Sequence, residues 1–147
     1  MRIRLINFGL DEICKIPERI KFGDCGYDCY ARESAIIPAH SVEKIPLGFG
    51  MIIPEGYTAY MHNRSGTFLR GLIVSDALID LNYRGEIHAI IANITDKDIK
   101  INRGERPCSL ILIPNMDINW INEDEEQKIL KLLNNERKDN IFKSSGK

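Results

Sequence analysis

The sequence predicts an all-β fold, a distorted antiparallel jelly roll or β-sandwich. Short apolar runs recur through most of the chain, and Gly and Pro interrupt them about every ten residues. A long helical pattern is absent from the sequence until residue 122. Many short strands with turn residues at regular spacing are typical of antiparallel sandwiches and barrels.

The first strand is expected at the N-terminus, where Ile3 and Leu5 alternate with Arg2 and Arg4. Alternation places the apolar side chains on one face of a strand, and this pattern differs from that of a signal peptide. The later apolar runs that we expect to form strands cover residues 35–38, 42–46, 49–54, 57–62, 77–79, 87–92 and 107–114.

Two of these runs, 87–92 and 107–114, are apolar at successive positions, so we expect both faces of each strand to be buried. Such strands belong either in the core of a sandwich or at a subunit interface. Residues 65–70 contain no helix breaker after Gly66 and predict a single helical turn.

The C-terminal part predicts a helix at 122–135 followed by an arm at 136–147. Asn122 and Glu125 have the spacing of a helix cap, and an apolar stripe at helical spacing follows at Ile129, Leu130, Leu132 and Leu133. This helix either packs on a β-barrel catalytic domain of residues 1–121 or binds a partner. The arm is polar apart from Ile141 and Phe142, and we expect it to be mobile without a ligand. The whole chain is expected to be one domain.

Composition narrows the possible functions. The chain has 147 residues, 44% of them hydrophobic and 28% charged, and a formal net charge of −1. This balance gives no electrostatic reason to expect binding to nucleic acid or to a membrane surface. The four cysteines lack C-x-x-C spacing, which argues against a structural zinc site and favours reduced thiols in the cytoplasm.

The segment of residues 77–86 is the most informative one for function. Two apolar runs flank a short polar stretch that ends in Gly85, which predicts a β-hairpin with Asp80 at the end of the first run and Tyr83 in the tip. A hairpin tip can offer backbone groups to a ligand, a carboxylate to a water molecule and an aromatic face to a sugar. The segment therefore indicates a nucleotide pocket.

Four further segments accompany it. They are Cys-Gly-Tyr-Asp-Cys-Tyr-Ala at 25–31, Asn-Arg-Ser-Gly at 63–66, Gly-Glu-Arg-Pro-Cys-Ser-Leu-Ile at 104–111, and Arg137 through Phe142 to Gly146. In this order and at these spacings, the five segments resemble the five motifs of the trimeric deoxyuridine triphosphatases (dUTPases). The resemblance covers about residues 2–114 and 137–147.

The resemblance implies hydrolysis of dUTP to dUMP and pyrophosphate, with water attacking the α-phosphorus. Asp80 is then the base that orients this water. Tyr83 packs under deoxyribose and leaves no room for a 2′-hydroxyl. Arg64, Ser65 and Gly66 grip the triphosphate, and these residue types suit that task because they supply a planar donor fork, a hydroxyl and an unobstructed backbone N–H.

Further roles follow from the same resemblance. Backbone groups near Ala77, Leu78 and Ile79 and at His88 read the uracil edge. Asp28 bonds to waters on a Mg²⁺ ion that the three phosphates hold, which agrees with the preference of Mg²⁺ for keeping its waters.

The fourth and fifth motifs complete the expected site. Ser109 stands where the family usually has a phosphate-binding Gln, and the shorter Ser would need a bridging water to reach a phosphate. The arm of a neighbouring subunit closes the site, and its contributing residues are Arg137, Phe142, Ser144, Ser145 and Gly146. The resemblance therefore implies a cytoplasmic homotrimer with shared active sites that binds dUTP and dUMP, uses Mg²⁺ and keeps uracil out of DNA.

Three other functions remain open from the sequence. A related dCTP deaminase would need a Glu where Ile90 stands, and Glu86 comes too early to replace it. A non-catalytic nucleotide-binding or regulatory protein could share the same fold. A nucleic-acid-binding barrel of the OB type is disfavoured by the net charge.

Overall fold

The structure of the chain is a computed structural model that describes residues 2–120. The chain divides into one unit of Met1–Met116 and a second of Asp117–Lys147. The helix expected at 122–135 and the arm expected at 136–147 lie outside the described residues, and both stay predictions.

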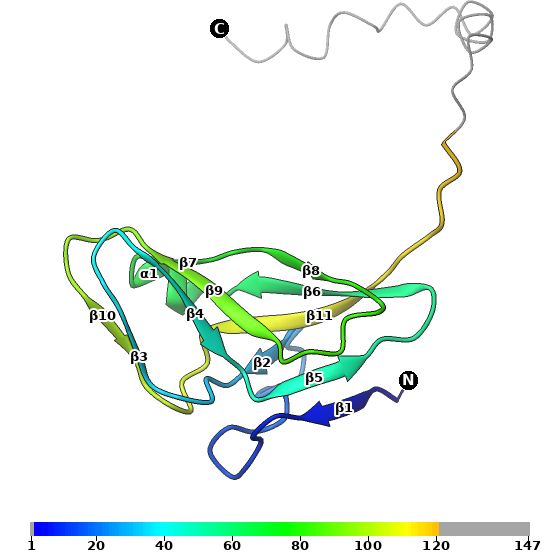
Figure 1. Ribbon diagram of the computed structural model, residues 1–147, viewed down its shortest axis with the longest axis horizontal. Coiled ribbons are helices and arrows are strands. Elements are labelled where there is room, and N and C mark those ends of the chain that lie inside the picture. Colours follow the sequence, from blue (N-terminus) through cyan, green and yellow to red (C-terminus); the bar gives the residue numbers. More distant parts are fainter. Residues whose placement is uncertain (1, 121–147) are drawn as a thin grey trace, which may run out of the picture. The chain divides into compact units, whose positions relative to one another are not determined.

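The described chain is built almost entirely from short strands (Figure 1). In chain order the elements are β1 (Arg4–Asn7), β2 (Tyr27–Cys29), β3 (Ala35–Ile37), β4 (Val42–Pro46), β5 (Phe49–Ile52), β6 (Tyr57–Asn63), α1 (Ser65–Leu69), β7 (Leu72–Val74), β8 (Ala77–Ile79), β9 (His88–Asn93), β10 (Ile99–Ile101) and β11 (Cys108–Pro114).

Every strand pair is antiparallel, and the described strands form two main sheets and two ribbons. The larger sheet has the order β2-β11-β6-β8, the smaller one has the order β4-β9-β7, and the ribbons are β1-β5 and β10-β3. The longest ladder joins β6 to β11 in a register that runs from Cys108 opposite Asn63 to Pro114 opposite Tyr57. The expected all-β sandwich or jelly-roll class is confirmed.

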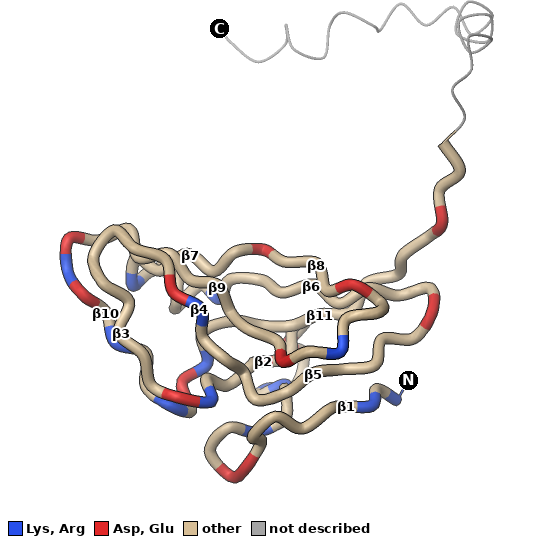
Figure 2. The backbone as a smooth tube through the Cα atoms, in the orientation of Figure 1, with Lys and Arg blue, Asp and Glu red and all other residues tan. Residues whose placement is uncertain are grey.

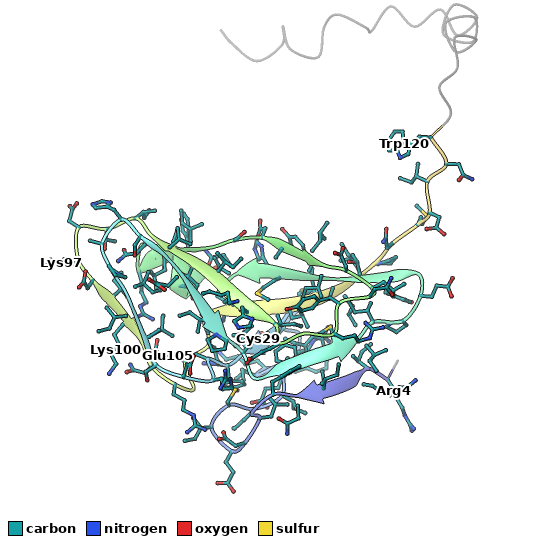
Figure 3. All side chains as sticks on the ribbon, in the orientation of Figure 1. Arg4, Cys29, Lys97, Lys100, Glu105 and Trp120 are labelled. Atoms are coloured by element: carbon teal, nitrogen blue, oxygen red, sulfur yellow. The ribbon has the colours of Figure 1, made fainter. Side chains whose placement is uncertain are left out.

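The core forms because side chains alternate along these strands. Ala59 and Met61 of β6 and Leu110 of β11 are at most 5% exposed, whereas Tyr60 between the first two is half-buried. Burial of a Leu, Ile or Met side chain stabilises the folded state by about 1.5–3 kcal/mol. Cys29 lies among these packed side chains, whereas Lys97 and Lys100 lie at the outer edge (Figure 3).

Most expected strands are confirmed, with bounds that are identical or shifted by one or two residues. The expected helical turn is α1. The three strands β2, β7 and β10, of three residues each, were not predicted.

The expected hairpin at 77–86 is wrong in its pairing. β8 pairs with β6, and β9 pairs with β4 and β7, so the two strands belong to different sheets. Their connection, residues 80–87, is longer than a tight hairpin turn, and it runs from one sheet to the other.

The two strands expected to be buried on both faces are buried on one face in the single chain. In β9, Ala89 and Ile91 are fully buried, but Ile90 is 45% exposed. In β11, Leu110 is buried, while Ile111 and Ile113 are half-buried. The expectation named two settings for such strands, the core of a sandwich and a subunit interface. In the single chain, the core covers one face of each strand.

Charged residues lie mostly in turns and at strand ends. Figure 2 shows acidic and basic residues alternating along the tube, as at Asp96, Lys97 and Asp98 between β9 and β10. None of the helices in residues 2–120 has the length and apolarity needed to cross a membrane.

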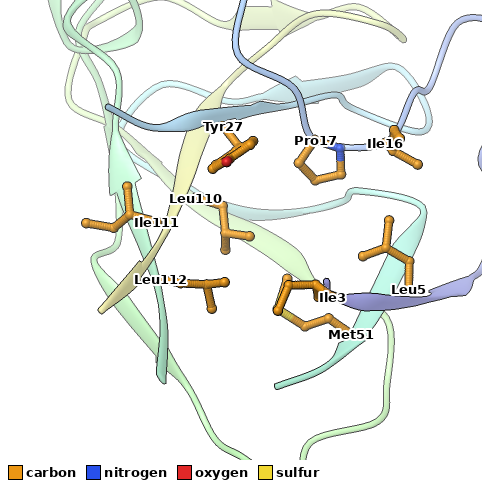
Figure 4. Close-up of a pocket in the computed structure, with 9 residues that line it drawn as sticks. All are labelled: Ile3, Leu5, Ile16, Pro17, Tyr27, Met51, Leu110, Ile111 and Leu112. Carbon is orange, nitrogen blue, oxygen red and sulfur yellow. The ribbon is translucent and has the colours of Figure 1, made fainter. Parts of the chain in front are cut away.

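An apolar pocket of ≈280 Å³ lies between β1 and β11 (Figure 4). Ile3 and Leu5 line it from the N-terminal side, Met51 from β5 and Leu112 from β11. Its lining contains no Asp, Glu, Lys, Arg or His, so this pocket offers no charged side chain to a phosphate.

Asn93, at the end of β9, is a buried polar side chain that is fully hydrogen-bonded. Its Nδ2 donates to the carbonyl oxygens of Ile37 at 2.9 Å, Pro38 at 3.2 Å and Lys97 at 2.7 Å. Its Oδ1 accepts from the backbone N–H of Thr95 at 3.0 Å and from the Thr95 hydroxyl at 2.8 Å. This network fastens the turn after β9 to the end of β3.

Replacing Asn93 with Leu should lower the free energy of unfolding by about 3 kcal/mol, because the substitution leaves buried carbonyl and N–H groups without partners. Chemical denaturation would measure the change. The control is Asn115→Ala, since Asn115 is exposed and its hydrogen bond to the described chain comes from its backbone N–H. Equal stability of the two variants would contradict the role of the network.

Candidate active site

Asp28 is the centre of a cluster that joins β2, β11 and the start of α1. It lies opposite Ser109 in the ladder between β2 and β11. Its Oδ1 accepts a hydrogen bond from the Ser109 hydroxyl at 3.0 Å and forms an ion pair with Arg64 Nε at 2.9 Å, and its Oδ2 accepts a hydrogen bond from Arg106 Nη1 at 2.9 Å. The Asp28 side chain is only 13% exposed, so the carboxylate holds both guanidinium groups from within the protein.

The cluster carries a net positive charge. One carboxylate faces two guanidinium groups, so one positive charge remains unbalanced within the cluster. Arg64 Nη1 also donates to the carbonyl oxygen of Arg106 at 2.6 Å. Arginine has five N–H donors; the ion pair engages Nε and the hydrogen bond uses one N–H of Nη1, so within the described chain three N–H groups of Arg64 are left for a ligand. The arrangement is therefore suited to bind an anion.

A cleft of ≈490 Å³ opens beside this cluster and is lined by Arg64, Ser65, Gly66 and Ser109. A Cβ atom added at Gly66 would meet no atom within 4 Å, and the φ angle of Gly66 is not positive. Neither packing nor backbone conformation explains glycine here. The absence of a side chain instead keeps the backbone of α1 accessible to whatever occupies the cleft.

A second pocket, of ≈250 Å³, lies between β8 and β9. Among the described strands, β8 is at the edge of its sheet and pairs with β6 alone. The expected residues that line this pocket are Ala77, Leu78, Ile79, Asp80, Tyr83 and His88. An extended edge with unpaired backbone groups can bind a planar ligand by hydrogen bonds, as a neighbouring strand would.

Asp80 follows β8 at the rim of this second pocket. It is exposed, and its carboxylate accepts no side-chain or turn hydrogen bond from the described part of the chain. Its backbone carbonyl accepts from the N–H of Tyr83 at 3.0 Å, which closes the turn. The carboxylate is therefore free to bind a water molecule.

Tyr83 has a fixed ring. Its hydroxyl donates to the carbonyl oxygen of Glu86 at 2.8 Å. A Cβ atom at Gly85 would lie 2.7 Å from this hydroxyl oxygen, so only glycine lets the ring approach the backbone this closely. The ring is 45% exposed and can present a face to a ligand.

The structure thus brings the expected site residues together in two groups. Asp28, Arg64, Ser65, Gly66 and Ser109 line the cleft, whereas residues 77–80, Tyr83 and His88 line the second pocket. The two pockets have no lining residue in common. Arg137, Phe142, Ser144, Ser145 and Gly146 lie outside the described residues.

Sequence reasoning left several neighbours out of the expected site. Arg106 lies within the matched fourth segment, and its basic character was the signal that could have placed it in the site. Lys44 lines the second pocket because β4 pairs with β9 and puts Lys44 opposite Ile90. Arg32 forms an ion pair with Glu86, which directly precedes Ile87 of this pocket. No local pattern identifies these last three residues, because their partners are distant in sequence.

Residues 2–120 contain no cluster of three or more His, Cys, Asp or Glu side chains that could hold a metal ion. A metal ion bound there would need further donor atoms from a bound nucleotide. Two of the about four lone-pair positions of the Asp28 carboxylate accept protein hydrogen bonds, and Arg64 Nε lies 2.9 Å from Oδ1 in an ion pair. Its Oδ2 can still accept one from a metal-bound water. The Ser109 hydroxyl donates its proton to Asp28, so its oxygen is left as an acceptor.

Two cysteines next to this cluster are poor candidates for a nucleophile. Cys29 and Cys108 lie opposite each other in the ladder and are fully buried. A hydrogen bond with Cys108 and burial raise the pKa of the Cys29 thiol well above its usual value. A buried, protonated thiol is a poor nucleophile.

Comparisons with known proteins agree on one family. Residues 12–146 match the model of the dUTPase family. The deoxyuridine 5′-triphosphate nucleotidohydrolase of Candida albicans is 35% identical over 136 residues, which cover 90% of this chain and 82% of that protein. The enzyme of the same name from Hydrogenobaculum is 31% identical, and the alignment covers 98% and 99% of the two chains.

Solved structures show the same fold. The dUTPase of Streptococcus mutans is 28% identical with a TM-score of 0.72, over 80% of this chain and 98% of that one. A dUTPase mutant from phage phi11 of S. aureus, described with a structural Mg(II) ion, is 21% identical with a TM-score of 0.71, over 85% of this chain and 99% of that one.

Replacing Asp28 with Ala should lower the free energy of unfolding by about 1–2 kcal/mol, a modest loss because both guanidinium groups are about one-third exposed. Adding Arg106→Met should recover part of the loss, since it removes an uncompensated charge. Thermal denaturation in low salt would measure both changes, with the exposed Glu55→Ala as control. A double variant less stable than Asp28→Ala would contradict the charge argument.

Proposed function

The chain belongs to the dUTPase family, and from this premise we propose that it hydrolyses dUTP to dUMP and pyrophosphate with the residues described above. The observation that supports this assignment best is the second pocket. It combines an open strand edge, a free carboxylate at Asp80 and an anchored ring at Tyr83. The strand edge suits the base, the carboxylate suits the water that attacks the phosphate, and the ring suits the sugar.

Asp80 is proposed as the general base. Its carboxylate would accept a proton from a water molecule while that water attacks the α-phosphorus. The bond between the α-phosphorus and the bridging oxygen to the β-phosphorus then breaks, and pyrophosphate leaves with the bond's electron pair. The free carboxylate suits this task because no described hydrogen-bond donor competes with the water.

The cleft around Asp28 is proposed to bind the triphosphate chain. Arg64 supplies its free N–H groups, and the open backbone at Gly66 lets a phosphate oxygen approach. Arg106, held by the same carboxylate, adds a second positive charge. Fixed cationic donors lower the barrier for a reaction that builds negative charge on a leaving phosphate.

The edges of β8 and β9 are proposed to read the uracil base. Backbone groups near Ala77, Leu78 and Ile79 and at His88 would pair with its polar edge. The ring of Tyr83 would then lie under the deoxyribose and exclude a 2′-hydroxyl by contact.

The family uses Mg²⁺, and we propose that this chain binds it together with the triphosphate. Asp28 Oδ2 would accept a hydrogen bond from one of its waters, and the Ser109 oxygen could accept another. When bound, the ion offsets phosphate charge. Ser109 would act on the phosphates through water, as its short side chain requires.

We also propose a homotrimer with shared sites. The support is the separation of the triphosphate cleft from the base pocket in the single chain, together with the exposed apolar side chains of β8 and β9, such as Leu78 and Ile90. A complete site would take Asp80 from one subunit and Arg64 from another.

The arm is proposed to close this shared site from a neighbouring subunit, on the strength of the sequence alone. The family match extends to residue 146 and includes it. Phe142 would stack on the base, and Arg137 with Ser144, Ser145 and Gly146 would contact the phosphates. The arm lacks the family's usual glycines at Lys138, Asn140, Ile141 and Lys143.

Deamination of dCTP is the alternative activity, and the lining of the second pocket does not support it. The side chain at the position where a deaminase has its acid–base Glu is Ile90, and Ile90 lines the second pocket. An apolar side chain cannot move a proton to or from a pyrimidine.

Replacing Asp80 with Asn should reduce kcat for dUTP by about 10²-fold or more while KM changes little, because the carboxylate acts on water and does not hold the substrate. Release of pyrophosphate from dUTP, dCTP, dTTP and UTP, assayed side by side, would measure this change and the substrate preference. Near wild-type turnover in the variant would contradict the role of Asp80 as the general base. Wild-type protein that binds dUTP without releasing pyrophosphate would instead be a non-catalytic binder.

Mixing two inactive variants tests whether sites are shared. Asp80→Asn and Arg64→Ala subunits should each be inactive alone but should regain activity when they are unfolded and refolded together. Random assortment into trimers would give about a quarter of the sites with both wild-type residues. Light scattering would report the trimer. Unrestored activity in confirmed mixed trimers would place both residues of each site on the same chain.

A further inference from the structure

Among the hydrogen bonds of the described chain, those of a single side chain tie the loop that carries Asp80 and Tyr83 to the protein body. The side-chain and turn hydrogen bonds of residues 80–85 end within residues 80–86. At Ile87 the backbone bonds to Leu47 and Phe49 and joins the body. Glu86 is the loop residue whose side chain bonds outside the loop.

The Glu86 carboxylate is held by two segments of the body. Arg32 donates through Nε to Oε1 at 2.8 Å and through Nη2 to Oε2 at 3.3 Å. The backbone N–H of Gly48 donates to Oε1 at 2.8 Å. Glu86 is 14% exposed and Arg32 is 33% exposed, so this bidentate pair is shielded from much of the solvent screening that weakens surface pairs.

The same residue holds the rings of the base pocket through its backbone. The Glu86 carbonyl oxygen accepts from the Tyr83 hydroxyl at 2.8 Å and from His88 Nδ1 at 2.9 Å. The path from the body to the Tyr83 ring is therefore short: Arg32 and Gly48 fix the Glu86 side chain, and its carbonyl fixes the ring.

The backbone of the loop packs closely against β5, so the position of the loop is tightly constrained. A Cβ atom at Gly50 would lie 2.6 Å from the carbonyl oxygen of Gly85, so the loop backbone rests directly on β5. A shift of the loop along this contact would carry the Tyr83 ring with it. Misplacement of about 1 Å in a site can cost about 10²-fold in rate.

We propose that Arg32 and Glu86, the Arg32–Glu86 clamp, are positioning residues that set how strictly the enzyme rejects ribonucleotides. The inference rests on the proposed function of Tyr83. A ring held in one place excludes a 2′-hydroxyl, whereas a ring that can withdraw admits it. Loss of the clamp should therefore affect UTP and dUTP unequally, which general loss of stability would not do.

The test is the ratio of kcat/KM for dUTP to kcat/KM for UTP in Glu86→Gln and Arg32→Lys. Gln keeps the size of Glu but removes its charge, and its amide N–H₂ meets the donors of Arg32. Lys keeps the charge but removes the fork. We expect the ratio to fall about ten-fold in each variant, chiefly through a gain with UTP.

The matched control is Arg103→Lys. Arg103 also forms an ion pair with a residue distant in sequence, Asp11, but neither of the two lines a proposed binding site. It should leave the ratio unchanged. Tyr83→Phe removes only the hydroxyl anchor, and combining it with Glu86→Gln should lower the ratio no further than either change alone. Unchanged ratios in the clamp variants, or fully additive losses in the double variant, would overturn the proposal.

A second readout does not need activity. NMR relaxation of ¹³C-labelled tyrosine rings should show more motion of Tyr83 in Glu86→Gln, with Tyr30 as internal reference because it is only 8% exposed. If the wild-type protein proved inactive on dUTP, the proposed function would fail, while ring motion would still decide the clamp. A Tyr83 ring as ordered in the variant as in the wild type would refute it.

Discussion

The ladder of β8, β6 and β11 is the constraint on which both proposed binding sites depend. Met61 of β6 lies opposite Ala77 on one side and Leu110 on the other, and its neighbour His62 lies opposite Ser109. Side chains alternate between the faces of a sheet, so a slip of one residue would turn Ser109 inward and Leu110 outward. The buried faces of Met61 and Leu110 fix the register, and the register fixes where the polar residues emerge.

A second constraint is the balance of charge around Asp28. One carboxylate holds two guanidinium groups and a hydroxyl, which orders the donors before any ligand arrives. Donors that are already oriented do not lose further conformational entropy on binding. The same cluster keeps a surplus of positive charge, so a triphosphate would replace solvent at a place that already favours an anion.

Much of the fold could be predicted from the sequence because the longer strands carry a local signal. Alternating side chains identify β1, and the apolar runs identify β9 and β11. The pairing of the segment at 77–86 could not be predicted, because only tertiary packing determines that β8 pairs with β6. The site followed from the order of five short segments, and the structure groups their described residues into two pockets.

Residues that act through long-range partners were beyond the sequence. Glu86 stands within a matched segment, yet its partner Arg32 is 54 positions away, and no local pattern joins them. Lys44 reaches its pocket only through strand pairing. Such contacts are set by the whole fold, so they become visible only when the strands have been placed.

The unpaired edge of β8 has a consequence for the protein in the absence of nucleotide. An exposed strand edge is a template on which another chain can add a strand, and proteins usually cover or charge such edges. Here the edge borders the proposed base pocket, where a covering side chain would block the ligand. Nucleotide bound along this edge would occupy the groups that a foreign strand needs, so the substrate would also protect the chain from unwanted association.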